Sequence, residues 1–274
     1  MRLDKPIGIF LLLWPTLWAL WIAAEGPPPL RILIVFILGV IVMRSAGCVV
    51  NDIADRHVDG AVERTKSRPL VVGTLTLKQA LVLFLVLSLV GLVLALQLNS
   101  YALSLAPIGL LLAIIYPFTK RVTHLPQLVL GAAFAWSIPM AFAAVSNDMP
   151  AVAWLLFGLA VLWPFCYDSI YALMDKEDDL KVGIKSTAIL FGKWNIAIIS
   201  ALQVTLILGW LMLGLSLNFN WFYYFGVLGA AIMMGYQGVL MTAHTPQNYY
   251  RAFYNNHWVG CIIFAGIIFN YLHV

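Results

Sequence analysis

Nine long apolar stretches alternate with short polar segments in this sequence, and they restrict the possible folds more than any other feature. They lie near residues 7–24, 32–50, 79–98, 101–118, 126–145, 151–173, 195–216, 221–242 and 256–272. A helix of about 20 apolar residues spans the hydrocarbon core of a bilayer. Barrel strands would instead alternate apolar and polar residues, which these stretches do not.

The composition also indicates that the chain folds in a lipid bilayer. Only 10% of the 274 residues are charged and 62% are apolar, and the mean hydropathy is +0.92. A soluble domain of this length needs far more charged surface. No linker or low-complexity segment divides the chain. We therefore predict an all-α membrane protein, one intramembrane domain over residues 1–274 that forms a bundle of about nine transmembrane helices.

The basic residues predict the orientation of this bundle. Of the sixteen Lys and Arg residues, Arg44 falls inside the second stretch and Arg31 on one side of the membrane. The other fourteen fall on the opposite side: Arg2, Lys5, Arg56, Arg64, Lys66, Arg68, Lys78, Lys120, Arg121, Lys176, Lys181, Lys185, Lys193 and Arg251. The positive-inside rule makes this side cytoplasmic, with the N-terminus inside and the C-terminus on the far side. The net charge of +4 therefore gives no indication of a nucleic-acid partner.

Acidic residues are concentrated in two short segments on the same side. Nine of the twelve Asp and Glu residues belong to them: Asp52, Asp55, Asp59 and Glu63 in the first, and Asp168, Asp175, Glu177, Asp178 and Asp179 in the second. Each segment begins where a long apolar stretch reaches the cytoplasmic side. The arrangement predicts an active site at that face of the membrane.

The spacing inside these segments indicates a metal. Steps of four from Asn51 to Asp55 to Asp59, and from Asp175 to Asp179, place each set on one face of a helix. Like charges at this spacing destabilise an isolated helix, whereas Mg²⁺ takes carboxylates together with substrate phosphate oxygens. The alternative is that both segments are solvated loops in which acids lie beside bases.

Basic residues flank both acidic segments and suggest an anionic substrate. Arg68, Lys120, Arg121 and Lys185 are the candidates for holding a diphosphate whose other oxygens bind the metal. The alternative for any one of them is that it only sets the topology.

At these residues the chain resembles the 4-hydroxybenzoate polyprenyltransferases of the UbiA prenyltransferase superfamily. Besides the two aspartate motifs, the matching stretches are 4–8, 13–18, 44–52, 67–70, 116–121, 123–127, 136–140, 167–172 and 183–187. The likeness extends from the N-terminus to about Gly192. Together the two motifs and their flanks are highly specific, whereas either spacing alone would be weak.

The resemblance implies an enzyme of the bacterial inner membrane that acts in ubiquinone synthesis. Such an enzyme transfers a polyprenyl group from polyprenyl diphosphate to 4-hydroxybenzoate, ortho to its hydroxyl, in the lipid bilayer. It also implies that Mg²⁺-diphosphate binds at Asn51, Asp55, Asp59, Asp175 and Asp179. The expected catalytic residues are these four aspartates and Arg121.

Further residues are expected to contact the organic parts of the substrates. Tyr116, Tyr167 and Tyr171 lie at the ends of apolar stretches and could stabilise an allylic cation, or could be interfacial belt residues. Arg44 lies within a span, where an unpaired cation is costly, so we expect an anionic partner. The aromatic carboxylate and Asp168 are equal candidates for that partner.

Three alternatives remain at this point. Another aromatic acceptor would use the same aspartate chemistry. The CDP-alcohol phosphotransferases also use Asp-rich motifs, but in one cluster, whereas this chain has two that lie far apart. A transporter would place its charges near the membrane midplane rather than at one face.

Overall fold

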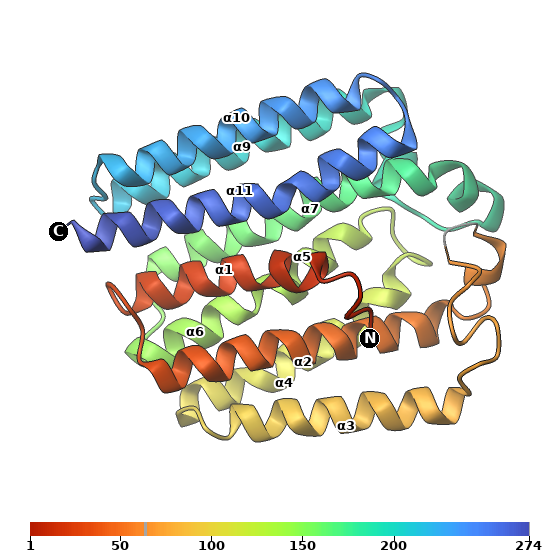
Figure 1. The fold of residues 1–274 in the computed structure, drawn as a ribbon, viewed down its shortest axis with the longest axis horizontal. Coiled ribbons are helices and arrows are strands. Elements are labelled where there is room, and N and C mark those ends of the chain that lie inside the picture. The colour runs from red at the N-terminus through yellow and green to blue at the C-terminus, as the bar shows by residue number, and fades with distance from the viewer. Residues whose placement is uncertain (63–64, 274) are drawn as a thin grey trace.

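The structure is a computed structural model that describes residues 1–62 and 65–273, and within them the chain is a bundle of long helices (Figure 1). The helices are α1 (Ile7–Ala23), α2 (Leu30–Asp55), α3 (Leu77–Ala95), α4 (Ser100–Thr119), α5 (Pro126–Ala135), α6 (Ser137–Ser146), α7 (Ala151–Val182), α8 (Thr187–Phe191), α9 (Asn195–Ser216), α10 (Trp221–Met241) and α11 (Pro246–Leu272). Two 3-10 turns accompany them, η1 (Asp59–Ala61) and η2 (Gly192–Trp194).

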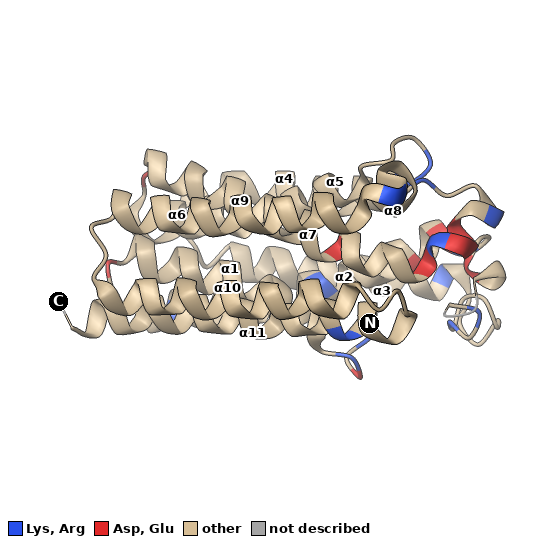
Figure 2. Cartoon of the chain, turned by 90° about the horizontal axis from the view of Figure 1, so that it is seen from above, with Lys and Arg blue, Asp and Glu red and all other residues tan. Residues whose placement is uncertain are grey.

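The expected membrane bundle is confirmed. By length and composition, eight helical segments of the described chain can cross a bilayer, with α5 and α6 counted together and α8 joined to α9; α1 is apolar but shorter. Most of the charged residues gather at one end of the bundle, which Figure 2 shows in blue and red. The C-terminus lies at the other end (Figure 1). The chain is therefore a multi-pass integral membrane protein.

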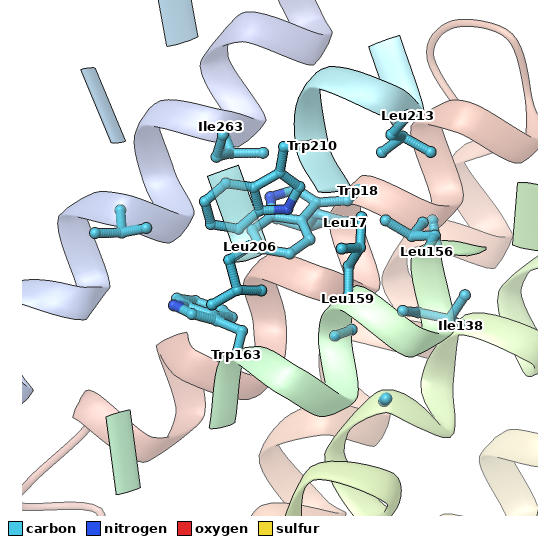
Figure 3. Close-up of a cluster of buried hydrophobic side chains, with 14 of the residues drawn as sticks. Leu17, Trp18, Ile138, Leu156, Leu159, Trp163, Leu206, Trp210, Leu213 and Ile263 are labelled. Atoms are coloured by element: carbon cyan, nitrogen blue, oxygen red, sulfur yellow. The ribbon is translucent and has the colours of Figure 1, made fainter. Parts of the chain in front are cut away.

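The core of the bundle is built around three buried tryptophans, Trp18 of α1, Trp163 of α7 and Trp210 of α9 (Figure 3). The ring centroid of Trp18 lies 5.2 Å from that of Trp163 and 6.1 Å from that of Trp210. Trp18 Nε1 also donates a hydrogen bond of 3.1 Å to the carbonyl of Gly260 in α11. One side chain thus fixes four helices relative to one another.

A chain of amides, two of them buried, joins the last three helices. Gln203 Nε2 of α9 donates to Gln237 Oε1 of α10 at 2.8 Å, and Gln237 Nε2 donates to Asn255 Oδ1 of α11 at 2.9 Å. Because hydrocarbon offers no partners to an amide, such bonds hold helices together within a membrane.

The helix ends differ from the sequence-based prediction at four places. The stretch at 126–145 is interrupted at Trp136, where Pro139 lacks the N–H that would continue α5. α11 begins at Pro246 rather than near 256, because Thr245 caps a first turn rich in polar residues.

The other two differences concern the acidic segments. The apolar stretch predicted at 151–173 is only part of a longer helix, because α7 continues through Asp175 and Asp179 to Val182 and ends at Gly183, which has φ 73°. We also expected Asn51, Asp55 and Asp59 to share one helix. This was wrong, because α2 ends at Asp55 and Asp59 begins the separate turn η1. Arg68 and Thr65, which reach Asp59 from the connecting loop, hold it in this separate turn.

Candidate active site

A cavity of about 1410 Å³ extends from the charged end of the bundle into its interior. Its polar wall contains residues of both acidic segments and of the connecting loops: Asn51, Asp52, Asp55, Asp59, Arg68, Lys120, Asp175, Asp179 and Lys185. Deeper in, the wall is apolar and comes from α2, α3, α4 and α5, as with Val40, Met43, Leu89, Leu92 and Leu110. The cavity therefore combines a charged head compartment with a long hydrocarbon compartment.

The first aspartate motif reaches the cavity from two elements. Asn51 and Asp55 lie in the last turn of α2, and Asp59 lies on η1. Asp55 and Asp59 are both buried, with exposed fractions of 5% and 6%. Thr65 fixes the turn, because its Oγ1 donates a hydrogen bond of 2.8 Å to the carbonyl of Asp59. The motif is thus brought together by a turn, although the predicted continuous helix is absent.

Basic residues compensate these buried carboxylates. Lys120 Nζ donates to Asp55 Oδ2, and Arg68 Nη1 donates to Asp59 Oδ2. Arg68 also lies 3.2 Å from Asp52 Oδ1, which accepts a further bond from Arg2. Burial raises the pKa of the Asp59 carboxyl above its ordinary value; Arg68 opposes this shift and the nearby Asp55 adds to it. The first motif is therefore a compact, charge-balanced unit.

The second motif reaches the same cavity from another helix, α7. Asp175 and Asp179 are both on α7, one helical turn apart as the spacing predicts, and both line the cavity. Asp178, between them in sequence, instead pairs with the exposed Lys181 at 3.1 Å and does not line the cavity. The helix thus separates two carboxylates that face the cavity from one that faces away.

No ready-made metal cage is present in residues 1–62 and 65–273, because no three His, Cys, Asp or Glu side chains converge there closely enough. The donor set nevertheless fits Mg²⁺, which binds through one or two carboxylates, keeps several waters and takes its other ligands from phosphates. Hard oxygen donors from α2, η1 and α7 line this one cavity. Such a site would be completed by its substrate.

Three of the four predicted diphosphate-binding residues line the cavity, and the fourth does not. Arg68, Lys120 and Lys185 line the cavity, and Lys185 connects two loops, because its N–H donates to the Lys120 carbonyl at 3.0 Å and its Nζ to the Val122 carbonyl at 3.1 Å. Arg121 is not among the cavity-lining residues. Its guanidinium donates to the carbonyl of Ala54 near the end of α2.

The predicted substrate-binding residues meet where the polar wall turns apolar. Arg44, Tyr116, Tyr167, Asp168 and Tyr171 all line the cavity. The Tyr167 hydroxyl is buried and, within the described residues, has no hydrogen-bond partner. Its ring packs at right angles against Trp163, with the centroids 5.3 Å apart. This junction between the polar and the apolar wall is therefore aromatic, and it contains a hydroxyl donor, that of Tyr167, with no partner among the described residues.

Arg44 makes no hydrogen bond to a carboxylate in the described part of the chain. Its Nη1 donates to Cys48 Sγ at 3.2 Å, its guanidinium lies 5.5 Å from the ring centroid of Phe134, and its Nε is buried without a partner there. These contacts do not include Asp168, one of the two anionic partners expected for it.

The sequence-based prediction omitted several polar residues of the site. Arg2 and Asp52 pair at its entrance, and Gln127 and Ser186 are buried cavity-lining residues with an unpartnered side-chain oxygen among the described atoms. Asp52 and Ser186 stand directly beside predicted site residues, but neither fits a four-residue step. Glu63 and Arg64, which the sequence placed in the acidic and basic clusters, lie outside the described residues.

Comparison with known proteins places this architecture in a family. The chain is 56% identical over 271 residues to a 4-hydroxybenzoate octaprenyltransferase of Coxiella burnetii, covering 99% of this chain and 94% of that protein. It is 54% identical over 273 residues to the protein of that name from Hydrogenovibrio crunogenus, covering 99% and 95%.

Solved structures share the fold. The apo structure of a UbiA homolog from Aeropyrum pernix K1 matches with a TM-score of 0.85, 28% identity and coverage of 98% of both chains. A UbiA homolog from Archaeoglobus fulgidus, solved with GPP and Mg²⁺, matches with a TM-score of 0.71 at 15% identity, covering 97% of this chain and 98% of that one. The model of the UbiA prenyltransferase family matches residues 12–261, and the chain belongs to this family.

Proposed function

We propose that this protein is a Mg²⁺-dependent 4-hydroxybenzoate polyprenyltransferase of ubiquinone synthesis. One observation supports this most directly: carboxylates of two distant segments, Asp55 and Asp59 on one side and Asp175 and Asp179 on the other, face a single cavity that continues as an apolar chamber. A polyprenyl diphosphate has the same division into a charged head and a long hydrocarbon tail. The relatives named 4-hydroxybenzoate octaprenyltransferase, at 56% and 54% identity, support the choice of acceptor.

The polar compartment would bind the diphosphate. Asn51 and the four aspartates would hold Mg²⁺, which when bound neutralises the charge that develops on the leaving diphosphate. Arg68, Lys120 and Lys185 would bind the remaining phosphate oxygens from the cavity wall. Arg121, which is bonded to the end of α2, would position that helix end and act on catalysis through it.

The junction would carry the chemistry. The allylic C–O bond breaks with its electron pair going to the diphosphate, and the ring carbon ortho to the acceptor hydroxyl then bonds to the allylic carbon. The ring proton leaves to a base. Tyr116, Tyr167 and Tyr171 stand at this level and would stabilise the allylic cation through their ring faces. The apolar wall excludes water, which would otherwise convert the cation to an alcohol.

The acceptor would bind beside Arg44 and Asp168. A guanidinium in an apolar surrounding binds a carboxylate strongly, so Arg44 would orient the aromatic acid with its carboxylate away from the diphosphate. The distribution of basic residues supports a cytoplasmic mouth for the cavity, a cytoplasmic N-terminus and a C-terminus on the far side. The bacterial relatives support a place in the bacterial inner membrane.

The test is product formation in membranes that contain the protein. Radiolabelled 4-hydroxybenzoate and a polyprenyl diphosphate should give a lipid-extractable product with Mg²⁺ and none with EDTA. Asp55→Ala and Asp175→Ala should abolish it. Asp178→Ala is the matched control, since it removes a carboxylate of the same acidic segment that does not line the cavity. No product from folded protein across several tail lengths would exclude 4-hydroxybenzoate, and other aromatic acceptors would be tested next.

A further inference from the structure

Arg44 lies on α2 within the membrane, and its guanidinium packs against the backbone of another helix. The contact is with Gly8 in the first turn of α1, a buried residue of the same cavity wall. A methyl carbon at Gly8 would lie 2.5 Å from both Nε and Nη2 of Arg44 and 2.8 Å from Cζ. These distances are far inside van der Waals contact. The guanidinium can therefore occupy its place only because residue 8 has no side chain.

Gly8 does not need to be glycine for its own backbone. It lies in a regular helix, it is absent from the residues with positive φ, and alanine is the better helix former by about 1 kcal/mol. The atoms that a methyl group would meet are the mobile end of a long side chain, which can rotate away at little cost. Alanine at residue 8 should therefore move Arg44 while leaving the helix intact.

The remaining contacts of Arg44 are too weak to hold it alone. Cys48 Sγ is a poor acceptor, and the contact with Phe134 fixes a distance but no direction. Nε has no partner among the described residues. The flat guanidinium is thus positioned mainly by the space that Gly8 leaves.

We propose that Gly8 is a positioning residue that holds the Arg44 guanidinium in the orientation that binds the carboxylate of the aromatic acceptor. The inference rests on the proposed function and adds the element that sets the selectivity for an acid over its uncharged analogue. It gives the first turn of α1 a role in acceptor recognition, although Gly8 itself carries no functional group.

The experiment compares binding and turnover of 4-hydroxybenzoate and its methyl ester by the wild type, Gly8→Ala, Arg44→Ala and the double variant. Gly8→Ala should raise the KM and Kd for the acid about tenfold, as expected for loss of one hydrogen bond to a charged group. The KM for the ester and for the polyprenyl diphosphate should change less than about twofold, and the Tm should not fall. Gly158→Ala is the control, because a methyl group at that helical glycine of α7 would meet nothing within 4 Å.

The double variant decides whether Gly8 acts through Arg44. Once Arg44 is alanine, Gly8→Ala should have no further effect on the affinity for the acid. Equal losses for acid and ester, or a full additional loss in the Arg44→Ala background, would overturn the inference while leaving the proposed function intact. Absence of product and of acid binding in the wild type would instead remove both.

Discussion

The ammonium group of Lys120, which follows the last residue of α4, is paired with Asp55, the last residue of α2. Both groups line the cavity, and Asp55 is almost fully buried. A buried carboxylate without its cation is costly, so this pair keeps the first motif charge-balanced before substrate arrives. The same ammonium group is well placed to bind the diphosphate.

Replacing Lys120 should therefore weaken diphosphate binding. We expect Lys120→Met to lower kcat/KM for the polyprenyl diphosphate about 10- to 100-fold, the range for one charged hydrogen bond. Lys120→Arg should retain most of the activity. Steady-state kinetics with varied diphosphate will measure this, with Lys181→Met as control because Lys181 pairs with Asp178 at the exposed surface. An unchanged kcat/KM in Lys120→Met would contradict the assignment.

Because the pKa of Asp59 is raised, we expect this carboxylate to lower the stability of the fold at pH 8 although the activity requires it. A carboxyl whose pKa is raised in the folded state stabilises the fold at low pH, and this contribution is lost as the pH rises above about 4, the value in an unfolded chain. In Mg²⁺-free buffer at pH 8, Asp59→Asn should thus have a Tm about 2 °C above the wild type. The difference should disappear at low pH, and the variant should be inactive.

Thermal unfolding in detergent between pH 4 and pH 8 provides the measurement. Mg²⁺ with a non-reactive diphosphate should raise the Tm of the wild type but not that of Asp59→Asn. A lower Tm for the variant at every pH would mean that the ion pair with Arg68 outweighs the cost of burial.

Arg68 and Arg121 should respond differently to removal. Arg68 lines the cavity and bonds to Asp59 and Asp52, whereas the guanidinium of Arg121 bonds to the Ala54 carbonyl. Arg68→Ala should raise the KM for the diphosphate about tenfold or more. Arg121→Ala should mainly lower the Tm and kcat, with a smaller change in that KM. If Arg121→Ala alone raised the KM strongly, Arg121 would have to reach the substrate in the bound state.

The chain of amides that joins α9, α10 and α11 should contribute to stability but not to activity. Gln237→Leu leaves both Gln203 and Asn255 without their partner in an apolar surrounding and should cost about 1–2 kcal/mol. Adding Gln203→Leu should recover part of this loss, because fewer polar groups then remain unpaired. Unfolding in detergent measures both variants, and Thr205→Val serves as control because Thr205 is exposed and bonds only within its own helix. Identical losses in the single and double variants would mean that the Gln203 amide finds another partner.

The membrane class, and the fact that most candidate site residues line one cavity, were predictable from the sequence because they depend on local features. Apolar length fixes the spans, and the step of four between Asp175 and Asp179 holds because α7 continues through both residues. Asp59 shows the limit of this reasoning. A step of four is equally compatible with a helix and with a turn that follows a helix end, and the choice depends on Arg68 and Thr65, which reach Asp59 from the connecting loop.

Contacts between distant segments could not be predicted in the same way. The pairing of Arg2 with Asp52 leaves no pattern in the chain, and neither does the contact between Gly8 and Arg44, because each joins two segments that only the tertiary fold brings together. Arg121 was predicted together with Lys120 to bind the diphosphate, but neighbouring residues at a helix end point in different directions, and of these two only Lys120 lines the cavity. The role of Arg121 stays a prediction.

The cavity wall includes residues of α2 from Asp55 back to Val35, and this length of helix, about 30 Å, matches the hydrocarbon core of a bilayer. An isoprene unit that enters the cavity therefore moves from the hydrocarbon of the lipid to a similarly apolar protein wall. Its partition coefficient between lipid and protein should be near one. Each added unit then contributes almost nothing to binding. The enzyme would accept tails of many lengths with similar affinity, and the length of its product would reflect the pool of diphosphates in the surrounding membrane.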